Sequence, residues 1–73
     1  MEANEAVDDP ERVVIDPDYS STSGRSARII GFSQSANDVL TIIVLTDEGV
    51  TYGVNAWRSN ARDRRIYWEG RLG

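Results

Sequence analysis

Arginine and tyrosine are the residues of this sequence best suited to act on a phosphate group. All eight basic residues are arginines, and a planar guanidinium can bind phosphate through two hydrogen bonds. Arg58 directly follows a predicted strand, and the helix predicted after it carries Arg62 and Arg65 within one turn, so the three side chains can converge. The candidate phosphate site comprises Arg28, Arg58, Arg62 and Arg65, with Tyr52 and Tyr67 as polar or stacking groups.

The same arginines also fit an ordinary solvated helix face. Arg64 or Arg65 can pair with Glu69, and Arg62 or Arg64 can pair with Asp63. The use of arginine in place of every lysine is also typical of a GC-rich genome. Residue types alone leave both interpretations open.

Several chemistries are excluded by composition. The chain has no histidine and no cysteine, which rules out histidine-dependent triads, disulfides and zinc sites with these ligands. The glycines lack the spacing of a phosphate-binding loop. Adjacent carboxylates occur at Asp8 and Asp9 and at Asp47 and Glu48, but such pairs in tails and turns are usually solvated. We therefore expect no metal and no cofactor.

Charge is unevenly distributed along the 73 residues. Residues 1–24 hold one arginine against seven acidic residues, whereas residues 25–73 hold seven arginines against five. This predicts an acidic arm, or a short helix, over residues 1–11 and a mildly basic α+β domain over residues 12–73. The acidic start lacks the apolar segment of a signal peptide, and no apolar stretch approaches 18 residues, so we expect no membrane span and a cytoplasmic location.

The strands that must position these residues are predicted from runs of apolar residues. Arg12–Asp16 reads as a short edge strand that ends before a proline, and 17–24 as a loop. Arg25–Ser33 alternates, and Val39–Leu45 is the apolar run typical of a central strand covered on both faces. Val50–Trp57 completes an antiparallel meander.

Local signals define the turns and the last strand. Gly49 can adopt the positive φ of a tight turn. Gly53 indicates a bulge or a close contact in mid-strand. Strict alternation would place Tyr52 on one face of that strand and Trp57 on the other.

The last segment is predicted to be helical. Asn60 fits the N-cap of a helix over 61–69, with Asp63 at the third position, and Gly70 fits its end. We expect an α+β fold: a small antiparallel sheet of three or four strands, with this helix and a short N-terminal helix packed on one face.

Four short segments carry a family resemblance. They are Ile30-Gly31-Phe32-Ser33, Val39–Gly49, Asn55-Ala56-Trp57-Arg58 and Asp63-Arg64-Arg65-Ile66-Tyr67. Together with Asn4-Glu5-Ala6 and Asp9-Pro10-Glu11-Arg12, they resemble the BrnT family of type II toxins over roughly residues 4–69.

The resemblance implies a RelE-like fold and a metal-independent endoribonuclease, in which the ribose 2′-hydroxyl attacks the adjacent phosphodiester. Arg58, Arg62, Arg65 and Tyr67 would then stabilise charge and supply protons. Arg28 and Tyr52 would bind RNA. An antitoxin protein is the implied partner.

A noncatalytic interaction module is the alternative. The chain lacks the basic N-terminal segment of the toxins, and Phe32 stands where they carry a basic residue. A net charge of −4 also opposes RNA binding. Because so small a core without disulfides is marginal, the chain can be expected to need a partner or a second copy of itself, as a homodimer. Trp57 and Trp68 are the candidate partner-binding residues.

Overall fold

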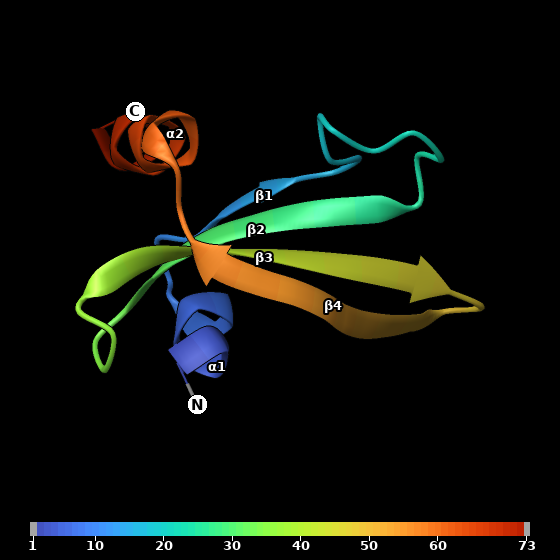
Figure 1. Cartoon of the computed structure of the whole chain (residues 1–73), viewed down its shortest axis with the longest axis horizontal. Coiled ribbons are helices and arrows are strands. Elements are labelled where there is room, and N and C mark those ends of the chain that lie inside the picture. The colour runs from blue at the N-terminus through green and yellow to red at the C-terminus, as the bar shows by residue number, and fades with distance from the viewer. Residues whose placement is uncertain (1, 73) are drawn as a thin grey trace.

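The computed structural model describes residues 2–72, which form one four-stranded sheet and two helices (Figure 1). The elements in chain order are α1 (Glu2–Asp8), β1 (Val13–Ile15), β2 (Ser26–Ser33), β3 (Asp38–Asp47), β4 (Val50–Arg58) and α2 (Ala61–Leu72). The predicted α+β class, both helices and all four strands are confirmed, with small differences at the ends of elements.

The sheet is an antiparallel meander in the order β1-β2-β3-β4. Its last hairpin turns at Glu48 and Gly49, whose φ angles are 51° and 81°. Two successive residues with positive φ are the signature of the tight turn whose twist matches that of the flanking strands. The predicted role of Gly49 is therefore confirmed.

The two helices lie on opposite faces of the sheet, so the expectation that both would share one face was wrong (Figure 1). On one face, Ala6 of α1 packs against Leu40 and Ile42 of β3. On the other, Tyr67 of α2 packs against Ile30 and Val39. The physical reason is that β2 and β3 are apolar on both faces, and each face needs its own cover.

The contact between α1 and the sheet depends on Gly31 of β2. A Cβ atom built on Gly31 would lie 2.1 Å from the carbonyl oxygen of Ala6, where no side chain fits. The backbone of α1 therefore rests directly on β2, which explains why this buried position is a glycine.

The start of α2 follows the prediction and its end does not. The Asn60 side chain accepts a hydrogen bond of 2.8 Å from the Asp63 amide, which is the expected N-cap. The helix continues through Gly70 to Leu72, however, so Gly70 is not its stop. A Cβ on Gly70 would come within 3.0 Å of the Val13 side chain, so this glycine serves close packing of α2 on β1.

A bulge in β4 changes which residues share a face. Gly53 pairs with Val44 and Asn55 pairs with Ile43, so Val54 is an extra residue in the ladder. The predicted bulge is confirmed, but the face assignment was wrong beyond it. One additional residue reverses the alternation, which places Trp57 on the same face as Tyr52, the face that α2 covers elsewhere.

Both helices lie toward one end of the sheet, and the β3–β4 hairpin extends away from them (Figure 1). In residues 2–72 neither helix is long and apolar enough to cross a membrane.

Candidate functional site

A buried polar cluster joins β2, the loop before it and the first turn of α2. The Arg28 guanidinium of β2 donates one hydrogen bond of 2.7 Å to Asp18 and another of 2.7 Å to Asp63. Arg28 is 5% exposed and Asp63 is fully buried, so these ion pairs are shielded from solvent. A buried cation between two carboxylates is electrically compensated.

Asp63 is the centre of this cluster. Besides the bond from Arg28, it accepts hydrogen bonds from the Tyr19 hydroxyl at 2.5 Å and the Thr41 hydroxyl at 2.7 Å. Thr41 also bonds Ser59. Burial by itself would raise the pKa of Asp63, but the bonds from Tyr19, Thr41 and Arg28 and the charge of Arg28 lower the pKa below its ordinary value.

The cluster also holds aromatic rings at the surface. The guanidinium carbon of Arg28 lies 4.2 Å from the centroid of the Tyr19 ring and 5.6 Å from that of the Trp57 ring. Arg62 lies 4.8 Å from the Tyr19 centroid. Such cation–π contacts hold Trp57, at the end of β4, against a rigid support.

A second ionic cluster is partly exposed. Asp38 accepts a hydrogen bond of 2.9 Å from Arg58 and two bonds from Arg64. These bonds hold the pKa of Asp38 far below its usual range, and the bond from Arg64 has the largest effect. The cluster links the start of β3 to the end of β4 and to α2.

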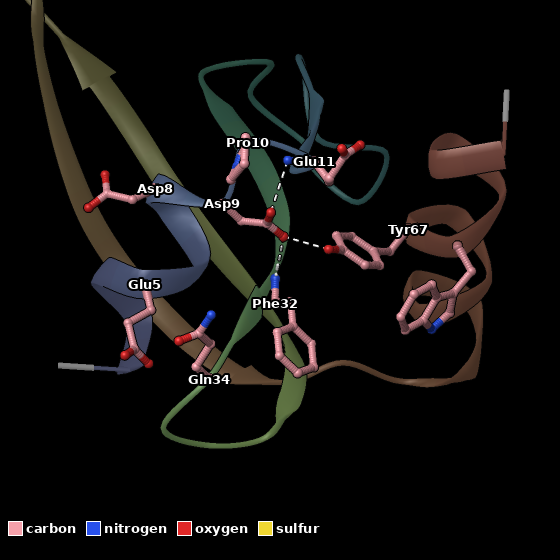
Figure 2. Close-up of a pocket in the computed structure, with 9 residues that line it drawn as sticks. Glu5, Asp8, Asp9, Pro10, Glu11, Phe32, Gln34 and Tyr67 are labelled. Atoms are coloured by element: carbon pink, nitrogen blue, oxygen red, sulfur yellow. Dashed lines mark hydrogen bonds between the residues drawn. The ribbon is translucent and has the colours of Figure 1, made fainter.

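A pocket of about 410 Å³ opens between α1 and α2 (Figure 2). Asp9 crosses it, accepting bonds of 2.9 Å from the Phe32 amide and 2.5 Å from the Tyr67 hydroxyl. The pocket is lined by Glu5, Asp8, Asp9, Pro10, Glu11, Phe32, Gln34, Tyr67 and Trp68. Because four of these residues are acidic, the pocket repels phosphate.

The edge strand β4 is the most open part of the described structure. All nine of its residues are exposed, including Val50, Tyr52, Val54 and Trp57 at 50%, 51%, 60% and 36%. Within residues 2–72, no strand lies beside its outer edge. The segment from Val50 to Trp57 carries no charge and no proline, which are two of the features that can protect an edge strand from pairing with another chain.

The structure separates the predicted catalytic residues. Arg58 shares the Asp38 carboxylate with Arg64, not with the predicted Arg62 and Arg65. Arg62 instead lies over Tyr19. Arg65 is exposed, and no hydrogen bond or ion pair holds it within residues 2–72. Tyr67 is 2% exposed, with its hydroxyl bonded to Asp9.

The predicted binding residues divide into buried and exposed. Arg28 is enclosed by carboxylates, whereas Tyr52 stands on the open face of β4. Trp57 is the next-to-last residue of β4, and Trp68 is 45% exposed with its ring 5.0 Å from that of Tyr67. The candidate interaction surface is thus the free edge of β4 with Val50, Tyr52, Val54 and Trp57, here called the β4 surface.

Sequence reasoning missed Asp18, Thr41 and Ser59. It gave Asp63 a capping role and an ion pair with Arg62 or Arg64, whereas the structure pairs Asp63 with Arg28. The sequence did indicate that Arg28 has a carboxylate partner. This arginine lies within the apolar alternation of β2, and a buried cation is not left unpaired. The partners themselves lie 10 and 35 residues away along the chain, and no local pattern indicates them.

No family model matches the sequence, and neither a curated protein nor a solved structure matches it significantly.

Proposed function

We propose that this chain is a noncatalytic interaction module that binds an extended protein strand along the edge of β4. The observation that carries the proposal is a nine-residue edge strand in which every residue is exposed and the first eight residues carry no charge. Main-chain hydrogen bonds along such an edge supply affinity, and side chains on its two faces supply specificity.

The exposed apolar side chains support the same function. Val50, Tyr52 and Trp57 lie on one face, and Trp57 is held by the Arg28 cluster. A rigid aromatic side chain loses little entropy on binding, which is why tryptophan and tyrosine dominate binding hot spots.

The BrnT resemblance gives ribonuclease activity as the competing proposal, and the contacts of its residues weigh against it. Arg28 is compensated by two buried carboxylates, Arg58 is bonded to Asp38, and Tyr67 is buried against Asp9. Phosphoryl chemistry needs uncompensated cations converging on one point. The purified chain should therefore cleave RNA no faster than its Arg58→Ala and Arg65→Ala variants, and faster cleavage by the unsubstituted chain would favour the toxin proposal.

A peptide with the sequence of residues 50–58 tests the binding function directly. Added to the ¹⁵N-labelled chain at up to about 1 mM, it should shift amide resonances of β4 and dissociate any oligomer formed through that edge. Val54→Lys should abolish the response, because a lysine on an edge strand disfavours further pairing.

The matched control is Val14→Lys, which changes a similarly exposed valine on β1, the opposite edge. The proposal requires that Val14→Lys respond like the unsubstituted chain. It would be overturned by resonances that do not move, or by equal shifts in the Val54→Lys variant.

A further inference from the structure

The strand that covers β4 can be identified from the charges at its two ends. Asp47 ends β3 and Glu48 lies in the turn that leads into β4, whereas Arg58 ends β4 and Arg62 follows in the first turn of α2. Between these ends the strand is uncharged. Its complement is a strand that is basic where β4 is acidic and acidic where β4 is basic.

We propose that the occupant is a second copy of this chain, paired antiparallel through β4 of both copies; this inference rests on the proposed function. In that arrangement the Asp47–Glu48 turn of each copy lies beside the Arg58 end of the other. A parallel pair would instead bring like charges together. The Arg58 side chain is 62% exposed despite its bond to Asp38, so its charge remains accessible.

The bulge in β4 favours one register. Because Tyr52 and Trp57 lie on the same face, a pair centred between Val54 and Asn55 sets Tyr52 of each copy opposite Trp57 of the other. Residues directly opposite in an antiparallel pair share a face, so both aromatic contacts form together. Without the bulge these two side chains would lie on opposite faces and could not meet.

The assembly closes on itself. Two-fold symmetry uses the same surface on both copies and joins two four-stranded sheets into one of eight strands. The outermost strand on each side is then β1, which is three residues long and so offers little edge for further pairing.

Sedimentation of the full-length chain over a range of concentrations measures the self-pairing. The unsubstituted chain should form dimers, and Val54→Lys should raise the dissociation constant by about tenfold or more, since the two lysines meet near the symmetry axis. Val14→Lys should leave the constant within about twofold of that of the unsubstituted chain. A chain that stays monomeric up to about 1 mM would overturn the inference.

Cysteine cross-linking tests the orientation, because the chain has no cysteine of its own. A disulfide needs Cα atoms within about 7 Å, which the antiparallel pair provides for Val54→Cys near the axis. The two copies of Val50→Cys would stand about 27 Å apart in that pair and adjacent in a parallel one. Under mild oxidation Val54→Cys should form covalent dimers and Val50→Cys should not; equal cross-linking, or none for Val54→Cys, would overturn the antiparallel arrangement.

The peptide experiment separates the two proposals. If the peptide binds β4 in a manner that depends on Val54 while the chain sediments as a monomer, strand binding stands and self-pairing fails. If neither occurs, both fail.

Discussion

Arg28 shows how one residue can be placed correctly and still be misinterpreted. Alternation put its side chain on the same face as Ile30 and Phe32, and the structure confirms that face. Its proposed contact with RNA assumed exposure, whereas Asp18 and Asp63 enclose it. Residue type and periodicity predict a direction, but burial depends on segments far away in sequence.

Replacing Asp63 by asparagine should destabilise the fold strongly. The change removes the negative charge opposite Arg28, and breaking one side of a buried ion pair typically costs about 3 kcal/mol or more. Urea denaturation should show a free energy of unfolding lower by about this amount, or a chain that no longer folds. Asp47→Asn removes the same charge from an exposed position and should stay within about 0.5 kcal/mol of the unsubstituted chain. Equal stability of the two variants would contradict this role of Asp63.

Among the elements, the positions of the strands and turns could be predicted almost completely. Which residues share a face of β4, and where α2 ends, could be predicted only in part. Gly53 indicated the bulge. The bulge reverses the alternation of faces beyond it, however, so Trp57 lies on the opposite face from the one predicted. The end of α2 was misjudged because a glycine late in a helix reads as a stop. Its packing against Val13 is a tertiary contact that overrides that local preference.

The close contact of α1 with Gly31 predicts that alanine destabilises the fold at this glycine but not at Gly53. Gly31→Ala would push a methyl group to within 2.1 Å of the Ala6 carbonyl oxygen, so α1 must shift. We expect a loss of about 1–3 kcal/mol, seen as a melting temperature lower by several degrees. At Gly53 a Cβ would meet nothing within 4 Å, so Gly53→Ala should melt near the temperature of the unsubstituted chain. A Gly31→Ala variant as stable as Gly53→Ala would show that α1 does not rest on β2.

At the scale of the whole molecule, the fold class and the meander could be predicted, and the placement of the helices on opposite faces could not. The apolar run of β3 predicted cover on both sides. Which helix covers which face depends on how the chain enters and leaves the sheet, and no local pattern encodes that. The same limit applies to the β4 surface, because its exposure follows from where the helices lie.

Carboxylates distributed over the whole molecule predict a loss of stability in acid. Hydrogen bonds from Ser33 and Ser35 lower the pKa of Glu5, and the pKa values of Asp38 and Asp63 are lowered as described above. A carboxyl group with a lower pKa in the folded state stabilises the fold above its unfolded pKa, near 4, and that stability is lost as the pH falls through the folded pKa.

The melting temperature should therefore change little between about pH 5 and 8 and fall steadily below about pH 4. Asp63→Asn, where it folds, should show a shallower fall, since one of the linked protons is missing. Stability that stayed constant or rose from pH 4 to pH 2 would refute the linkage.

The uncharged edge of β4 has a further consequence when the chain is produced in quantity. An exposed strand edge without charges can template the addition of further chains, which is how soluble domains form fibrils and inclusion bodies. The proposed pairing of two copies would remove that template, and a lysine at Val54 would block it in a single copy. Val54→Lys should therefore stay in solution at high expression even though it does not pair.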